Sequence, residues 1–256
     1  MKIKVISDLH IDHNEDFKLE TKFDDTFTIV AGDIAQVPEY KEKFLKQIKN
    51  GLWIAGNHDY WDQKDVDSGV KYFKKQYPKE NSFSYLENDY KIINDIVFIG
   101  CTLWTDFNLY NDPGIAAFFT KDWPDFRYNN IIDSESNTIR LMNHNDMIKR
   151  FKESVAYIEN TLEKFKDKHC VLIAHFVPIT KGIAPKYKHL DTNAFFASNL
   201  DWLFDKYSNI KLLIFGHTHE CFSGEIFNCK YICNPRGYLK HGEGQCFKPN
   251  LIVEVK

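Results

Sequence analysis

The sequence has no long hydrophobic run and few cysteines. Its apolar stretches, such as Ile96-Val97-Phe98-Ile99 and Leu212-Leu213-Ile214-Phe215, are as long as strands, whereas a membrane span needs roughly 20 apolar residues. Six cysteines in 256 residues are too few for a disulfide scaffold, so we expect a soluble cytoplasmic protein with reduced thiols. The strand-like stretch Lys2-Ile3-Lys4-Val5-Ile6 follows Met1 directly, so we expect no signal peptide.

The chain also lacks a large excess of charge of either sign. It has 33 basic and 36 acidic side chains and a net charge of −3. This balance excludes a protein that is basic throughout and coats nucleic acid, although a local basic groove remains compatible with it. With 43% hydrophobic residues, the composition is that of a folded protein, and we expect one domain over residues 1–256.

Short apolar stretches typical of strands recur along the chain, with helical patterns between several of them. The predicted strands are 2–7, 27–31, 52–55, 92–103, 169–174, 210–215, 225–233 and 250–255. Helices are predicted over 39–49 and 65–77, and a third is indicated by apolar residues spaced alternately three and four apart from Ile148 to Phe165. This order predicts a layered α/β domain with a mixed sheet.

Segment 104–140 breaks this pattern, because its prolines, glycine and aromatic residues follow no steady period. A long irregular segment inside a compact domain is usually a functional lid or a small subdomain. Since its aromatic residues can pack, a linker is disfavoured. We predict an insertion or lid over the active site.

Polar residues follow five predicted strands at the point where each strand ends. They are Ser7-Asp8-Leu9-His10, Gly32-Asp33, Gly56-Asn57-His58-Asp59, His175 and Gly216-His217-Thr218-His219. Because the carboxyl ends of strands in α/β sheets converge on the ligand crevice, we expect these groups to lie together. Taken singly, an Asp here is more commonly a helix N-cap, a His is more commonly a hydrogen-bonded loop residue, and Gly-Asn-His-Asp could be a plain turn. Together, these carboxylates, amide and imidazoles are suitable ligands for divalent metal ions, and they are more numerous than the ligands of one ion.

These motifs, in this order, resemble the calcineurin-like metallophosphoesterase superfamily over positions 8–219. More narrowly, Cys101-Thr102-Leu103-Trp104-Thr105-Asp106-Phe107, Asp125-Phe126-Arg127 and Asn234-Pro235-Arg236-Gly237-Tyr238 resemble a group of small bacterial and phage phosphohydrolases. The resemblance implies a four-layer αββα sandwich of two mixed β-sheets flanked by helices. It also implies two metal ions and hydrolysis of phosphodiesters or phosphomonoesters by a metal-bridging hydroxide.

The resemblance further implies a role for each motif. The implied metal ligands are Asp8, His10 and His219 at one ion, Asn57, His175 and His217 at the other, and Asp33 between the two. His58 would protonate the leaving group, and Asp59 would orient His58. The second acid that usually follows Gly-Asp in the family is absent, because Ile34-Ala35-Gln36 stands there.

The chemistry explains why such residues are needed. Two metal ions neutralise phosphoryl oxygens and lower the pKa of a water between them. Nitrogen and oxygen ligands without sulfur fit Mn²⁺, Fe, Zn²⁺, Co²⁺ or Ni²⁺. We expect Mn²⁺, with Fe as the next candidate.

Other side chains could contact a substrate. Arg127 and Arg236 are candidates for binding phosphate, and a solvated charge or a loop contact is the alternative for each. Tyr238 could stack on a substrate ring, although core packing is favoured. A structural zinc at Cys229, Cys233 and Cys246 is disfavoured, because no Cys-x₂-Cys pair is present.

Two other functions compete with hydrolysis of a small phosphoester. A DNA or RNA nuclease is possible on these motifs, but the acidic net charge disfavours it. A catalytically silent scaffold for protein binding would be expected to lose ligands, whereas the full set is present. We expect no membrane partner, and the sequence indicates no particular oligomeric state.

Overall fold

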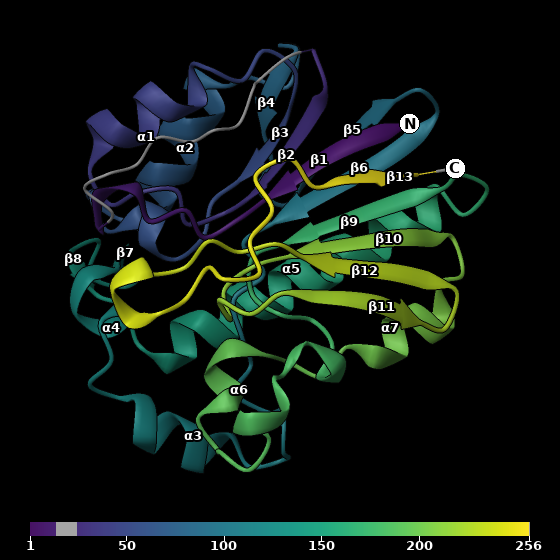
Figure 1. Ribbon diagram of the computed structural model, residues 1–256. Helices are drawn as coiled ribbons and strands as arrows, with labels where there is room; N and C mark the ends of the chain where they lie inside the picture. Colours follow the sequence, from purple (N-terminus) through teal and green to yellow (C-terminus); the bar gives the residue numbers. More distant parts are fainter. Residues whose placement is uncertain (14–24, 256) are drawn as a thin grey trace.

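The computed structural model describes residues 1–13 and 25–255, whose strands form two large sheets (Figure 1). The first sheet has the order β13 (Ile252–Glu254), β1 (Lys2–Ile6), β2 (Phe27–Ala31), β3 (Gly51–Ile54) and β4 (Phe83–Tyr85). The second has the order β11 (Phe222–Ile226), β12 (Cys229–Cys233), β10 (Ile210–Phe215), β9 (Cys170–Ala174), β6 (Ile96–Cys101) and β5 (Asp89–Ile93). Parallel strands form the middle of each sheet, and the antiparallel strands β13, β11 and β5 lie at edges.

The alternation of side chains along each strand builds two apolar cores. Ile3 and Val5 of β1 belong to a core between the sheets, where they join Ile173 of β9 and Ile214 of β10. Ile6, with the opposite parity, belongs to a larger core that includes the helices. Both faces of the central strands are therefore buried, which explains their nearly continuous apolar sequences.

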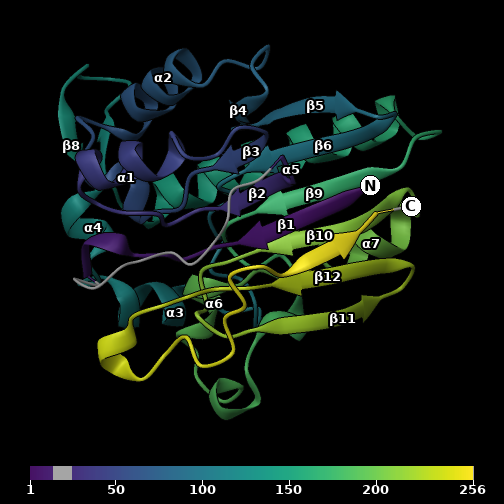
Figure 2. The same cartoon turned by 45° about the horizontal axis from the view of Figure 1, so that its top comes forward.

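Helices cover the outer faces of the two sheets. The first sheet is covered by α1 (Pro38–Leu45) and α2 (Val66–Gln76), and the second by α5 (His144–Lys164) and α7 (Asp201–Lys206), as Figures 1 and 2 show. Phe73 of α2 packs edge-on against Trp53, with 4.8 Å between ring centroids. This is the four-layer αββα sandwich that the resemblance predicted. Short 3-10 helices among the described residues are Ile11–His13, His58–Tyr60, Thr180–Gly182, Pro185–Tyr187 and Leu239–His241.

Two predicted strands are in fact hairpins. The stretch 92–103 contains the end of β5 and all of β6, separated by Asn94 and Asp95, whose φ angles are 49° and 66°. The stretch 225–233 likewise contains a turn, between β11 and β12. Tight hairpin turns require positive φ, which Asn and Asp tolerate, so Asn94-Asp95 was the signal that the prediction missed. The three-residue strand β4 was also missed.

Segment 104–140 has secondary structure of its own. It contains α3 (Pro113–Thr120), α4 (Asp125–Tyr128) and a hairpin of β7 (Asn130–Ile132) with β8 (Ile139–Leu141). The description as an irregular segment was therefore wrong, because short elements leave little periodicity to detect. Whether it acts as a lid stays a prediction. Helix α3 packs against α6 (Asn193–Phe196).

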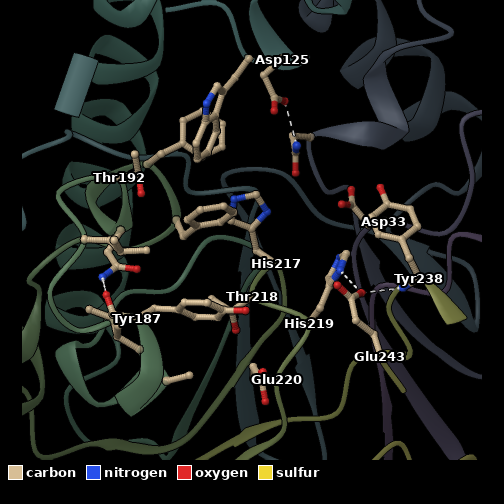
Figure 3. A pocket seen from close by; sticks show the side chains of 18 of the residues that line it. Asp33, Asp125, Tyr187, Thr192, His217, Thr218, His219, Glu220, Tyr238 and Glu243 are labelled. Carbon is tan, nitrogen blue, oxygen red and sulfur yellow. Dashed lines mark hydrogen bonds and ion pairs between the residues drawn. The ribbon is translucent and has the colours of Figure 1, made fainter. Parts of the chain in front are cut away.

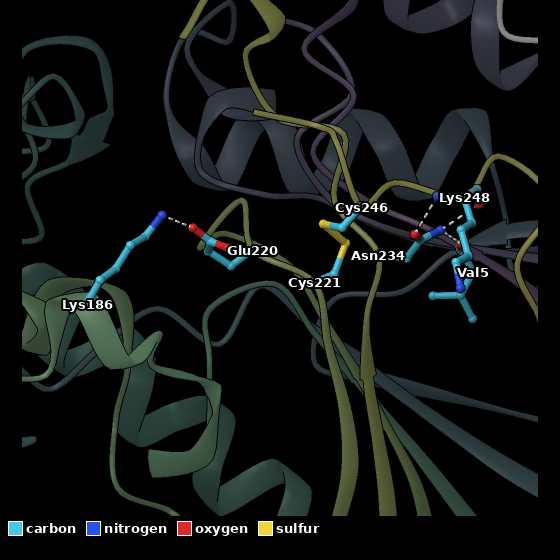
Figure 4. Close-up of a disulfide and its surroundings, with 7 residues drawn as sticks. All are labelled: Val5, Lys186, Glu220, Cys221, Asn234, Cys246 and Lys248. Atoms are coloured by element: carbon cyan, nitrogen blue, oxygen red, sulfur yellow. Dashed lines mark hydrogen bonds and ion pairs between the residues drawn. A yellow bond between two sulfur atoms is a disulfide. The ribbon is translucent and has the colours of Figure 1, made fainter. Parts of the chain in front are cut away.

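The expectation of reduced thiols is wrong for one pair of cysteines. Cys221, which directly precedes β11, forms a disulfide with Cys246, in the loop between β12 and β13 (Figure 4). Asn234 ties the same loop to the first sheet by donating to the backbone oxygens of Val5 and Lys248, at 2.8 and 2.9 Å. The pairing also removes Cys246 from the zinc site considered above. No helix in the described part of the chain is long and apolar enough to cross a bilayer.

The disulfide predicts how many cysteine thiols are free to react in the unreduced protein. Protein denatured without reductant should react with a thiol reagent at four cysteines, because Cys101, Cys170, Cys229 and Cys233 are free. A variant with both Cys221→Ser and Cys246→Ser should give the same count. A count of six in the unreduced wild type would contradict the disulfide.

Candidate active site

The polar motifs meet where the carboxyl ends of strands from both sheets come together. Asp8 and His10 follow β1, Asp33 follows β2, and Asn57 follows β3 in the first sheet. The second sheet supplies the remaining groups: His175 after β9, and His217 and His219 after β10. The sandwich therefore brings together all seven side chains that the sequence suggested as metal ligands.

The backbone at these residues is strained. Five of the seven have φ in the left-handed region: Asp8 (50°), His10 (41°), Asp33 (54°), His217 (74°) and His219 (52°). Such conformations cost about 1–3 kcal/mol each and persist only where the surrounding structure enforces them, which is typical of functional sites.

The glycines beside the motifs permit the close approach of these loops. A Cβ atom at Gly56 would lie 2.1 Å from Oδ1 of Asp33, and one at Gly216 would lie 2.6 Å from Oδ2 of Asp8. Any larger residue would displace a carboxylate of the site. The glycines in Gly-Asn-His-Asp and Gly-His-x-His therefore serve the packing of the site.

Asp33 lies at the centre of the cluster. Its Oδ2 is 3.3 Å from Nε2 of His175, 3.7 Å from Nε2 of His10 and 4.0 Å from Nε2 of His58. Three groups place their ligand atoms within 4.8 Å of one another: Asp8, His10 and His219; His10, Asp33 and His58; and Asp33, His175 and His217. Asp33 therefore lies between His10 and His58 on one side and His175 and His217 on the other.

Neighbouring groups orient the imidazoles and the amide. His175 donates from Nδ1 to the backbone oxygen of Ala31 at 2.8 Å, which leaves Nε2 facing Asp33. Nδ1 of His219 lies 2.7 Å from Glu243, so that Nε2 faces the site (Figure 3). A hydrogen bond from the second ring nitrogen is the usual way to orient a metal-binding histidine.

Asp125, in α4, orients Asn57. Oδ1 of Asp125, labelled in Figure 3, accepts from the amides of Asn57 at 2.8 Å and Asn129 at 2.9 Å. The oxygen of Asn57 is thereby turned toward Nε2 of His175, at 3.1 Å. Burial raises the pKa of Asp125 to about 7. Sequence reasoning did not give this role to Asp125, or the contact with His219 to Glu243. Neither residue has a spacing relation to its partner that could have revealed it.

The protonation states of two histidines suit metal binding, whereas a third, His175, would have to release a proton to bind an ion. Burial lowers the pKa of His10 and of His217 well below the usual range, so both imidazoles are neutral at pH 7. Burial alone would lower the pKa of His175, but the charges of Asp33 and Asp8 raise it to about 9. Buried Nε2 of His217 has no hydrogen-bond partner in the described part of the chain. An unpartnered buried nitrogen beside a carboxylate fits a metal ligand.

His58 lies beside the cluster, stacked on Trp61 with 3.8 Å between ring centroids. Burial lowers the pKa of His58 to about 4, and the amide of Gln36 lies 3.3 Å from its Nδ1. The carboxylate of Asp59 does not orient this ring as expected. It accepts backbone N–H groups of Asp33, Ile34 and Gly56 at 2.8, 3.2 and 2.9 Å. His58 and Asp59 are consecutive residues of a 3-10 helix, so their side chains point in different directions, and that of Asp59 is buried in the interior.

A cavity of about 450 Å³ opens beside these groups. Its lining includes Asp33, His58, His217 and Tyr238, and Tyr238 also stacks on His10 at 4.3 Å between ring centroids. Neither Arg127 nor Arg236 is part of this lining. Arg127 is exposed on α4, and Arg236 is half-buried after β12, with its backbone N–H donating to Ser7.

The family model of calcineurin-like phosphoesterases matches residues 1–221. The chain belongs to this family. It is therefore a metal-dependent hydrolase that acts on phosphoric esters.

Three known proteins are distantly similar to this phosphoesterase. An uncharacterized protein of Acanthamoeba polyphaga mimivirus is 23% identical over 99% of this chain and 96% of its own length. A solved phosphopantetheinyl hydrolase from Mycobacterium tuberculosis has a TM-score of 0.68 at 17% identity, covering 93% of this chain and 90% of that one. A dimetal phosphatase from Danio rerio has a TM-score of 0.50 at 8% identity, covering 93% and 88%. At these identities the solved structures share the fold.

Proposed function

We propose that this phosphoesterase uses two divalent metal ions to hydrolyse small phosphodiesters or phosphomonoesters. The observation that carries the proposal is the position of Asp33, whose carboxylate faces ligand groups on both sides. When bound, two ions supply the positive charge that neutralises phosphoryl oxygens and lowers the pKa of a water nucleophile. The Danio rerio neighbour is a dimetal phosphatase, which supports the proposal.

Each group of ligands would hold one ion. One group is Asp8, His10 and His219, the other is Asn57, His175 and His217, and Asp33 belongs to both. Oxygen and nitrogen donors without sulfur suit Mn²⁺, which we propose as the metal, with Fe as the next candidate. The neutral oxygen of Asn57 leaves more positive charge at its ion than a carboxylate would.

His58 is the proposed proton donor to the leaving group. It lines the cavity, and its ring is neutral at pH 7 because burial holds its pKa at about 4. An anionic phosphate beside Nε2 raises that pKa, since a nearby negative charge favours the protonated ring. Gln36 contacts Nδ1, and stacking on Trp61 holds the plane of the ring.

The cavity disfavours the nuclease alternative. Among the described residues, neither lysine nor arginine is part of its lining, and a nucleic-acid backbone is bound mainly by such cations. Arg127 and Arg236 stay candidates for contact with a longer substrate. The cytoplasm stays the proposed location, although a disulfide is more typical of oxidising compartments.

The role of Asp33 predicts a metal-binding defect. Asp33→Asn should weaken binding of both ions, because loss of the shared negative charge increases repulsion between two cations. Asp205→Asn, at an exposed position of α7, should bind metal like the wild type. Metal content after loading with Mn²⁺ and gel filtration measures this. Two equivalents of unchanged affinity in Asp33→Asn would exclude the shared role.

Asp125 should affect one ion. Asp125→Leu removes the acceptor for the Asn57 amide, and loss of such a support typically weakens metal binding about 10- to 100-fold. Asp122→Leu, an exposed control three residues earlier, should have no effect. Titration calorimetry with Mn²⁺ distinguishes one weakened site from two. Wild-type binding by Asp125→Leu would show that Asn57 does not depend on this contact.

His58→Asn tests the proton donor. A nitrophenolate leaves without a proton, so a p-nitrophenyl ester should lose little activity, whereas an alkyl ester should lose about 10²- to 10⁴-fold in kcat/KM. Metal content, measured alongside, should stay near that of the wild type. Equal losses on the two esters would refute proton donation by His58.

A further inference from the structure

The cavity has a second wall that contains none of the proposed metal ligands. It is formed by Trp123 from segment 104–140 and by Ile183, Tyr187, Leu190 and Phe196 from the chain after β9. In Figure 3, Tyr187 and Thr192 lie across the cavity from Asp33 and Tyr238, with His217 between the two sides. One end of the cavity is therefore polar and the other is apolar.

The aromatic rings of the apolar wall pack against one another. The ring of Trp123 lies 4.6 Å from that of Phe195 and 5.3 Å from that of Phe196, centroid to centroid. Phe196 in turn lies 5.1 Å from His217, so the wall is continuous with the proposed metal ligands. Rings in such mutual contact have little freedom, and they present a surface on which another ring can stack.

Hydrogen bonds hold the backbone behind this wall. The amide of Asn193 donates to the backbone oxygen of Tyr187, and the hydroxyl of Tyr110 donates to that of Lys188 at 3.1 Å. The hydroxyl of Thr105 donates to the backbone oxygen of Ala194 at 2.6 Å. Segment 104–140 and the chain around 183–196 are thereby joined, which fixes the spacing of the side chains that they present.

The charges of the lining exclude a second anion. Of the acidic groups in the lining, Glu220 is ion-paired with Lys186, and Glu243 contacts His219 at the proposed metal-ligating end. The described lining contains neither lysine nor arginine that could pair with a further phosphate or carboxylate. An anion buried there would lose its hydration without compensation, whereas a neutral ring would gain from burial.

We infer that the substrate is a phosphoester whose organic group is neutral and contains an aromatic ring. The ring lies against Trp123, Leu190 and Phe196 while the phosphate lies at the metal-ligating end. The cavity of about 450 Å³ is of the size that takes small ligands. This substrate class rests on the proposed function, and it disfavours polyphosphates, bisphosphorylated sugars and nucleic-acid strands.

Binding of phosphonates to the Mn²⁺-loaded protein tests the inference without turnover. Methylphosphonate, phenylphosphonate and 4-carboxyphenylphosphonate have the same head group and differ only in what they present to the wall. By titration calorimetry, phenylphosphonate should bind at least about tenfold more tightly than methylphosphonate. The added carboxylate should cancel that gain. Equal affinity for the methyl and phenyl compounds, or a gain from the carboxylate, would overturn the inference.

A substitution at the rim of the apolar wall tests whether the preference for the phenyl compound arises there. Leu190 is 39% exposed and is not a proposed metal ligand, so Leu190→Lys should fold normally. The new cation should reduce the preference for phenyl and should restore binding of the carboxyphenyl compound. Leu141→Lys, at a 50% exposed position of β8 outside the lining, is the matched control and should leave all three affinities unchanged. Equal behaviour of the two variants would show that the ring binds elsewhere.

Hydrolysis of bis-p-nitrophenyl phosphate by the same protein separates the two proposals. Hydrolysis without a preference for phenyl overturns the aromatic site and leaves the proposed function intact. A preference for phenyl without hydrolysis of any ester supports the aromatic site and overturns the proposed chemistry.

Discussion

Asp33 places a carboxylate in the dry junction between two sheets, where its negative charge has to be balanced. Removing a lone charge from water costs several kcal/mol, and here imidazoles from both sheets surround it. Burial alone would raise the pKa of Asp33, but His175 and His58 hold it well below the usual range. The same carboxylate and imidazoles are the candidate ligands of a metal ion.

The backbone around Asp33 depends on Asp59. Three backbone N–H groups from the loops after β2 and β3 donate to this one carboxylate, so the loops are joined by charge-assisted hydrogen bonds. Such support offsets the cost of left-handed φ at the site residues. Asp59 therefore acts on the site through the main chain, and Gln36 takes the position beside His58.

The remaining supports come from segments outside the motifs. Asp125 reaches Asn57 from the insertion, and Glu243 reaches His219 from the loop that the Cys221–Cys246 disulfide ties to β11. The insertion also supplies Trp123 to the apolar wall. The motifs thus supply the candidate ligands, while segments between and after the motifs orient these ligands and line the cavity beside them.

The sequence by itself determined the central strands, the main helices and the set of candidate metal ligands, because each ligand stands at the end of an apolar strand and parallel strands end at one edge. Only the tertiary structure decided which groups support those ligands. Asn57 and Asp125 are 68 residues apart, and Cys221 and Cys246 are 25 apart. Contacts at such separations leave no periodic trace in the chain. The apolar wall was hidden for the same reason, since Trp123 and Phe196 come from distant parts of the chain. The hairpin turn at Asn94-Asp95, by contrast, had a local signal in its two turn residues.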